Sequence, residues 1–438
     1  MTLMHVTTRA EELLVRDARG RPAPLAPAVE AIPPGAPVAI LAHGYKYRPF
    51  ERGRDPHAWL YGLPGEGPSG ADWPAQLGFS RLDPADGLCI GFGWDAWAAH
   101  GASLARGRRN GFAEVYDRAA AAGESLAALI AHLHVLRPDL KVDLFAHSLG
   151  ARVALQALAD PRVRPALGRA LLLGAAEDAG LARAAMAAGD GRGGEVFHIA
   201  ARHNDPYDAL FEAAAPRLAG RRRQALGRAG LGAARADWID LQLDLPAFAD
   251  WARARGVPLA DAAPRVCHWS FYDRPGAMDL HRAILRERHD WSILALRAAG
   301  APEGLAPRWS RLAPPLVPAL ASATPDPAAA PAARRGWAGP WPALRRAAIG
   351  AERYGARQIG ADLVARARSP ERQRLGPAQP LALGRTFRHV LIVEGHHRTG
   401  DPEQRQEDEA QHRAFRQLQN EPLQPAGRCL IADHPAIS

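Results

Sequence analysis

The sequence predicts an α/β fold built on a mostly parallel, doubly wound sheet. Short apolar runs, dense enough for strands buried on both faces, occur within residues 37–47, 141–158, 170–176 and 195–212. The second of these runs continues at once as an amphipathic helix with an apolar stripe. Strands that alternate with helical patterns in this way are typical of a parallel sheet covered on both faces.

The junction of strand and helix within 141–158, KVDLFAHSLGARVALQAL, carries a candidate nucleophile. Ser148 stands between small residues, with Ala146 two positions before it and Gly150 two positions after it. A sharp strand-to-helix turn lifts such a serine out of the sheet and leaves no room for bulky neighbours. Ala146 departs from the glycine of the G-x-S-x-G pattern, but it is still small. A serine that only caps the helix is the structural alternative.

A second turn supports the same site. The run PVAILAHGYKY at 37–47 ends in His-Gly-Tyr, and the ends of parallel strands gather at one edge of a sheet. We expect the backbone N–H groups of Tyr45 and Leu149 to form an oxyanion hole beside Ser148.

These motifs resemble those of the α/β-hydrolase superfamily, over roughly residues 35–295. The segments LAHGYKY, AHSLGARVAL, ARHND and CHWSFYDRPG are similar to those of a bacterial subgroup without a settled substrate. The resemblance implies an α/β-hydrolase fold and the chain order serine, acid, histidine for a catalytic triad.

The acid of this triad is expected after a strand downstream of Ser148. The run at 195–212, EVFHIAARHNDPYDALFE, ends its strand at Asn204-Asp205-Pro206, and Asp205 is the predicted acid. Asp208 stays open as an alternative. The structural reading is that Asp205 starts a turn or caps the following helix.

The base is predicted to be His268, in the short aromatic segment RVCHWSFYDRPG. His281 and His289 are the rivals, and both are interpreted as solvated residues of a helix face. His43, in the His-Gly turn, is interpreted as structural.

Aromatic residues concentrate in and after the long Gly- and Pro-rich loop at 46–80, which is typical of a lid or binding loop. Tyr47, Trp59, Tyr61 and Trp73 are therefore predicted to bind an apolar part of the substrate.

The expected function is that of a serine hydrolase that cleaves a carboxylic ester or a related small acyl compound through an acyl-enzyme. No metal-ligand motif and no phosphate-binding loop occurs in residues 1–300, so neither a metal nor a cofactor is expected. The alternative is a catalytically silent protein of this fold that binds or scaffolds partners. The sequence leaves oligomeric state open, as well as the choice among ester, thioester and amide, and between hydrolysis and acyl transfer.

The length of 438 residues predicts more than one unit. Residues 1–300 are expected to form the hydrolase domain, and 312–336 a Pro/Ala-rich linker. Residues 337–438 are expected to form a small α/β or partly disordered appendage, with a strand near 386–395.

The net charge is +9, and all but two of the 55 basic residues are arginine. The charge is nearly balanced in residues 1–300, so no nucleic-acid partner is expected; the Arg-rich stretch 334–388 is the exception, where phosphate or a membrane surface could bind. Three widely spaced cysteines predict no disulfide framework. Without a secretory leader or an apolar run of membrane-spanning length, a cytoplasmic protein with no membrane span is expected.

Overall fold

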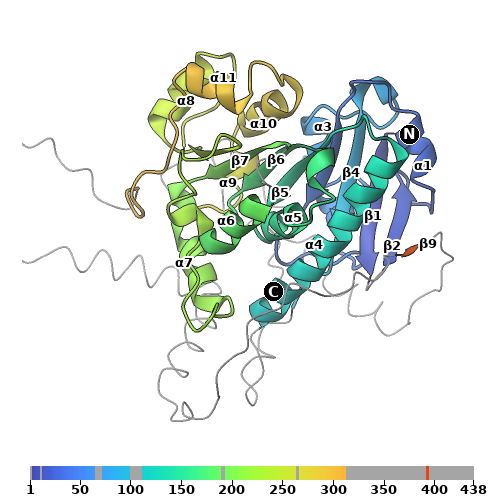
Figure 1. Cartoon of the computed structure of the whole chain (residues 1–438), viewed down its shortest axis with the longest axis horizontal. Helices are drawn as coiled ribbons and strands as arrows, with labels where there is room; N and C mark the ends of the chain where they lie inside the picture. The colour runs from blue at the N-terminus through green and yellow to red at the C-terminus, as the bar shows by residue number, and fades with distance from the viewer. Residues whose placement is uncertain are drawn as a thin grey trace, which may run out of the picture.

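The computed structural model describes residues 2–9, 12–64, 72–98, 111–188, 193–262, 266–311 and 391–393. They form an α/β fold around a sheet with the strand order β8-β7-β6-β5-β3-β4-β1-β2-β9 (Figure 1). Neighbouring strands run parallel, except that β1 and β2 are antiparallel. The prediction of an α/β fold with a mostly parallel sheet is therefore confirmed.

The strands are short. They are β1 (Leu3–Arg9), β2 (Glu12–Asp17), β3 (Val38–Ala42), β4 (Leu88–Gly93), β5 (Val142–His147), β6 (Leu167–Leu173), β7 (Glu195–Ala200), β8 (Trp238–Gln242) and β9 (Leu391–Val393). β3, β5 and β7 lie within predicted apolar runs, and β6 overlaps one. Every residue of β3, β4, β5 and β8 is buried, as expected for strands covered on both faces.

Side chains of these strands alternate between two hydrophobic cores. In β3, Val38, Ile40 and Ala42 belong to the first core, whereas Ala39 and Leu41 belong to the second. This period of two places one core on each face of the sheet.

The first core is covered by α1 (Ala26–Glu30), α4 (Gly111–Leu136), α5 (Leu149–Leu158) and α6 (Ala179–Ala188). Figure 1 shows α4 and α5 crossing in front of the sheet. The second core is covered by α2 (Pro56–Trp59), α3 (Trp73–Gln76), α8 (Pro246–Arg253), α9 (Ser270–Asp273), α10 (Ala277–Arg286) and α11 (Ile293–Ala298). The helix α7 (Asp205–Ala214) follows β7.

Among the helices of the described ranges, α4 alone is long and apolar enough to cross a membrane by length and composition. Its most apolar window has a mean hydropathy of 1.4, and 50% of that window is buried inside the protein. Val115, Leu126 and Ile130 of α4 are part of the first core. Packing on the sheet accounts for this apolar sequence, as in a core helix.

The predicted linker 312–336 lies outside the described residues, and so does the predicted appendage 337–438 except for β9. β9 falls within the strand predicted near 386–395. It pairs in parallel with β2, with Leu391 opposite Glu12 and Val393 opposite Leu14.

Two cysteines lie in the described part of the chain. Cys89, in β4, is a free and fully buried thiol. Cys267 is disulfide-bonded. Cys267 lies one residue before His268.

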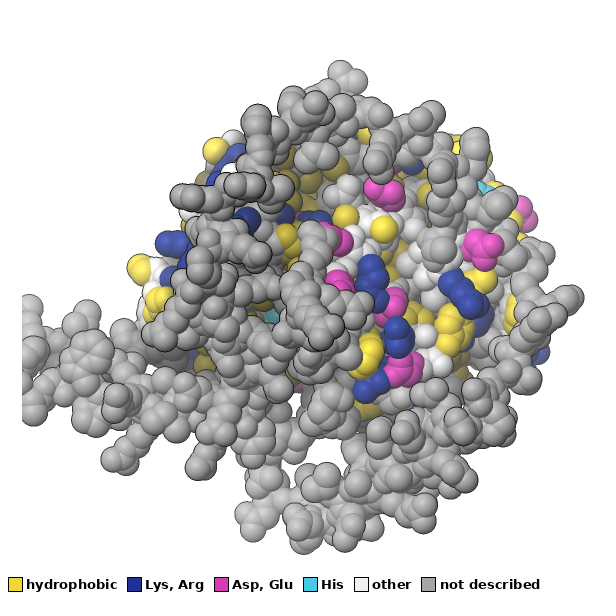
Figure 2. All heavy atoms as spheres, turned by 90° about the horizontal axis from the view of Figure 1, so that it is seen from below, with side chains coloured by type: hydrophobic (Ala, Val, Ile, Leu, Met, Phe, Trp, Pro, Cys, Tyr) yellow, Lys and Arg dark blue, Asp and Glu magenta, His cyan; other side chains and the backbone are white. Residues whose placement is uncertain are grey.

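Charges on the described surface are paired over short distances. Arg162 and Asp160 lie 2.7 Å apart, and Arg235 and Asp237 lie 2.8 Å apart. Figure 2 shows one face of the molecule. On the part of this face that is not drawn in grey, basic and acidic side chains lie next to one another. A salt bridge at the protein surface contributes only about 0–1 kcal/mol to stability, so such pairs mainly leave the described surface with charges of both signs.

Candidate active site

The strand order makes β3 and β5 a topological switch point of the sheet. These strands are parallel neighbours, and Ala42 pairs with Ala146 near their carboxyl ends. The chain leaves β3 toward α2 and the second core, but it leaves β5 into α5 and the first core. Two adjacent strands whose connections depart to opposite faces form a crevice at their carboxyl ends, where α/β sheets bind ligands.

Ser148 lies at the carboxyl end of β5, at this switch point, as the single residue between β5 and α5. Its backbone has φ 57° and ψ −122°, a conformation that costs a non-glycine residue about 1–3 kcal/mol. The N–H of Ser148 donates to the carbonyl of Leu173, and its own carbonyl accepts from the N–H of Ala176. The elbow predicted from the sequence is therefore present, and hydrogen bonds to the segment around the end of β6 hold it.

Two glycines allow the turn after β3 to approach the elbow. A Cβ on Gly44 would lie 2.7 Å from Ser148 Cβ, and a Cβ on Gly150 would lie 2.3 Å from the carbonyl oxygen of Ala42. Real Cβ atoms do not make such contacts. The small residues of both motifs therefore allow the same close approach, between the His-Gly-Tyr turn and the beginning of α5.

We expect Gly150→Ala to lower the free energy of unfolding by about 2–3 kcal/mol, because the added methyl meets backbone that cannot move aside as a side chain can. Urea unfolding followed by circular dichroism measures the change. Gly232→Ala is the control, since its Cβ meets nothing within 4 Å and only its positive φ opposes alanine, at a cost of about 1 kcal/mol. Equal losses for the two variants would contradict the close approach.

His268 reaches Ser148 from a loop between α8 and α9. Its Nε2 lies 2.9 Å from Ser148 Oγ, and its Nδ1 lies 2.6 Å from the side-chain oxygen of Asn204. The ring of His147 donates from Nε2 to the backbone carbonyl of His268 at 2.9 Å. The structure therefore brings together the predicted nucleophile and the predicted base, and His147 fixes the backbone of that base.

Burial lowers the pKa of His268 well below its ordinary value of 6.5, and the neighbouring His147 lowers it further. The imidazole is therefore neutral at neutral pH. A neutral imidazole that donates from Nδ1 to Asn204 presents the lone pair of Nε2 to the hydroxyl of Ser148.

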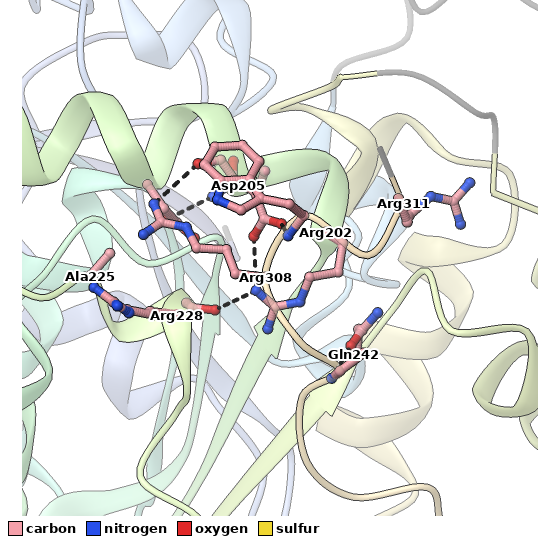
Figure 3. Close-up of polar contacts among 12 residues, drawn as sticks. Arg202, Asp205, Ala225, Arg228, Gln242, Arg308 and Arg311 are labelled. Atoms are coloured by element: carbon pink, nitrogen blue, oxygen red, sulfur yellow. Dashed lines mark hydrogen bonds and ion pairs between the residues drawn. The ribbon is translucent and has the colours of Figure 1, made fainter. Parts of the chain in front are cut away.

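Asp205, the predicted acid, does not contact His268, which corrects that prediction. Its carboxylate accepts from Arg202 Nη1 at 2.8 Å and from the backbone N–H of Trp309 at 2.6 Å. Figure 3 shows Asp205 among Arg202 and Arg308. Asp205 is the first residue of α7, and successive residues of a helix project about 100° apart. Asp205 therefore points away from the direction that Asn204 takes.

Asn204 occupies the position expected for the acid. It follows β7 as the last residue of the short helix η3 (Arg202–Asn204), and it is buried. Its side-chain nitrogen donates to Asp208 Oδ1 at 3.0 Å. Asp208, the alternative acid, therefore contacts Asn204 rather than His268. Burial, opposed in part by Arg308, raises the pKa of Asp208 to about 8.

The rival histidines lie elsewhere. His281 is fully buried in α10, with Nε2 2.7 Å from the carbonyl oxygen of Phe271, so its interpretation as a solvated residue was wrong. His289 is exposed. His43 accepts at Nε2 from the N–H of Trp94, and its Nδ1 lies 2.9 Å from the Gly44 carbonyl, contacts that fit its structural interpretation.

The four aromatic residues predicted to bind substrate lie in the second core, so that prediction is corrected. Tyr61 and Trp73 are 0% and 1% exposed, and Tyr47 and Trp59 are 7% and 6% exposed. The Trp73 ring lies 5.3 Å from that of Phe145. The described part of the loop at 46–80 contains α2 and α3, and its apolar side chains cover the sheet.

Three other aromatic residues, Tyr45, Tyr207 and Trp269, lie at the site, and each is only partly buried. The ring of Tyr207 stacks on His268 with centroids 4.5 Å apart, and Trp269 lies 6.2 Å from His268. Tyr45 follows Gly44 in the turn beside Ser148. The sequence signal was their position inside the selected motifs, in HGY, NDPY and CHW, rather than the local density of aromatic residues.

The predicted oxyanion donors lie beside the nucleophile. Leu149 is the first residue of α5, and the first N–H groups of a helix have no partner within it. Within the described ranges, no hydrogen bond is found for the N–H of Leu149 or for that of Tyr45. The same ranges contain no group of three His, Cys, Asp or Glu residues placed to hold a metal ion.

No family model matches the chain, and no curated protein matches it. The function is therefore argued from the geometry of the site.

Proposed function

We propose that this protein is a serine hydrolase of the α/β-hydrolase type, which cleaves a carboxylic ester or a related small acyl compound. The observation that carries the proposal is the hydroxyl of Ser148, on a strained elbow, 2.9 Å from Nε2 of a neutral, partly buried His268. A structural serine needs neither the strain nor the imidazole. The resemblance of the motifs to α/β hydrolases supports the same function.

In the first step, His268 Nε2 takes the proton of Ser148 Oγ while Oγ attacks the substrate carbonyl. In this mechanism the backbone N–H groups of Tyr45 and Leu149 stabilise the oxyanion. The imidazolium then gives its proton to the leaving alcohol, and an acyl-Ser148 remains. In the second step, His268 activates water, and the acid product leaves with Ser148 restored.

Asn204 is the third member of the proposed triad. It accepts from Nδ1–H of His268 and so selects the tautomer with a free Nε2. An amide carries no charge, so it stabilises the imidazolium less than a carboxylate does. The depressed pKa of His268 is consistent with such a partner.

We expect a fluorophosphonate probe to label the folded wild-type protein at Ser148, because the probe reacts with a serine activated by a base. Mass spectrometry of the labelled peptide identifies the residue. Ser148→Ala should remove the label, whereas Ser292→Ala, at the N-cap of α11, should keep it.

A folded wild-type protein that takes no label would favour the alternative, a catalytically silent binding or scaffolding protein. If labelling succeeds, a panel of short- and long-chain acyl esters, thioesters and amides identifies the class of substrate that is hydrolysed.

A further inference from the structure

A chain of three side-chain contacts extends behind Ser148. Ser148 Oγ lies 2.9 Å from His268 Nε2, His268 Nδ1 lies 2.6 Å from Asn204 Oδ1, and Asn204 Nδ2 lies 3.0 Å from Asp208 Oδ1. The last of these contacts is not needed for the proposed mechanism.

An asparagine in this position has two possible orientations. Its amide can present the oxygen to His268, as it does here, or it can present the NH₂ group after rotation of its side chain. In the second case Nδ1 of His268 must accept, so Nε2 carries the proton and cannot act as a base. The analogous aspartate has no wrong orientation, because both of its oxygens accept.

We propose that Asp208, as an ionised carboxylate, is a positioning residue that holds the amide of Asn204 with its oxygen toward His268, and thereby selects the imidazole tautomer that can take the proton of Ser148. This inference rests on the proposed function for its effect on turnover. The selection of the tautomer itself is a property of the four side chains and can be measured without a substrate.

The placement of Asp208 suits this role. It lies four residues after Asn204, one turn along α7, and it is 3% exposed. On its other side it packs against Gly227, where an added Cβ would lie 2.4 Å from Asp208 Oδ2. The carboxyl group is therefore confined between Asn204 and the backbone of the short helix η4 (Leu226–Arg228).

The ionised carboxylate only accepts hydrogen bonds, so it can contact only the NH₂ end of Asn204. A protonated Asp208, or an asparagine in its place, can contact either end. The variants are therefore compared at a pH about one unit above the pKa of Asp208, which is raised to about 8.

The decisive pair of variants is Asp208→Asn and the exchange Asn204→Asp with Asp208→Asn. Asp208→Asn keeps the shape but removes the acceptor-only group, and we expect kcat to fall about tenfold or more with little change in KM. The exchange variant places the carboxylate at His268 and the amide behind it. It should restore kcat at least to the wild-type value, because a carboxylate has no wrong end.

The imidazole tautomer of His268 is a second measurement. It would not change if Asp208 had only a structural role. The ¹⁵N shifts of the imidazole in histidine-labelled protein distinguish Nδ1–H from Nε2–H, and His268→Gln identifies the signal by its loss. We expect Nδ1–H in the wild type and in the exchange variant, and a large share of Nε2–H in Asp208→Asn.

Asp205→Asn is the matched control, because it changes a buried carboxylate of the same helix that contacts neither Asn204 nor His268. It should alter thermal stability but leave the tautomer unchanged. An unchanged tautomer and kcat in Asp208→Asn would overturn the proposal. Tautomer selection as expected, in a protein whose Ser148 takes no probe, would instead overturn the proposed function and leave the role of Asp208 intact.

Discussion

Replacing His268 with alanine is expected to lower kcat for an activated aryl ester by about 10⁴-fold or more. The variant removes the atom that lies 2.9 Å from Ser148 Oγ, and the described structure places no other imidazole ring nitrogen within hydrogen-bond distance of that oxygen. Without a base the serine hydroxyl is a weak nucleophile at neutral pH. Initial rates at saturating ester, and the rate of fluorophosphonate labelling, measure the loss.

His289→Ala is the control for this variant, because His289 is exposed and is one of the rival bases in the sequence. It should leave kcat and labelling within twofold of the wild type. A His268→Ala protein that folds and keeps most of its turnover would reassign the base and remove the main support for the mechanism.

Changing Asn204 is expected to affect both rate and pH dependence. Asn204→Ala leaves Nδ1 of His268 without its acceptor, and kcat should fall about 10²-fold, because the competing tautomer is no longer disfavoured. Asn204→Asp places a carboxyl group at the same position. Its carboxylate favours the imidazolium and raises the pKa of His268. Kinetics of both variants across pH test the two expectations.

The sign of the pH effect follows from the folded pKa of His268. In the wild type this pKa is depressed, so His268 stays neutral below pH 6.5, and kcat/KM should hold as the pH falls through 6.5. In Asn204→Asp the acid limb should move to higher pH. Asp208 can stay protonated beside the new carboxylate, since its pKa is already raised to about 8. An acid limb at the same pH in both proteins would contradict the contact of residue 204 with Nδ1.

The sequence predicted four of the strands because burial on both faces requires continuous apolar runs. β3, β5 and β7 lie within those runs, and β6 begins three residues before its run. It also predicted Ser148 and its neighbours, since the elbow constrains backbone and side-chain size within a few residues. His268 was selected from its loop and its family resemblance. These predictions rest on local rules, which a single sequence contains.

Asp205 was predicted to contact His268, but the preceding residue, Asn204, makes that contact. A turn after a strand can place either Asn204 or Asp205 toward the site, and the choice depends on where η3 ends and α7 begins. The expectation of a negative charge favoured Asp205, but Arg202 and the backbone of Trp309 use that carboxylate. Neither contact can be read from local sequence, because Trp309 is 104 residues away.

The errors at His281 and at the aromatic cluster have different causes. In α10, Ala277, Leu280 and Ile284 mark the buried face, and His281 falls on it. That signal was present in the sequence and was not used. The density of aromatic residues between 45 and 97 did not reveal which side of the sheet they cover. Their burial became evident only with the arrangement of α2, α3 and β5.

The proposed triad draws its members from the ends of three different strands and loops, at positions 148, 204 and 268. No single segment of the chain contains more than one of them, so an activated alcohol exists only after β5, β7 and the loop after α8 have all assembled. Covalent titration with an excess of probe would therefore count native molecules in a preparation. The same titration during refolding would report the joint assembly of β5, β7 and the loop after α8, whereas far-ultraviolet circular dichroism reports helix content alone.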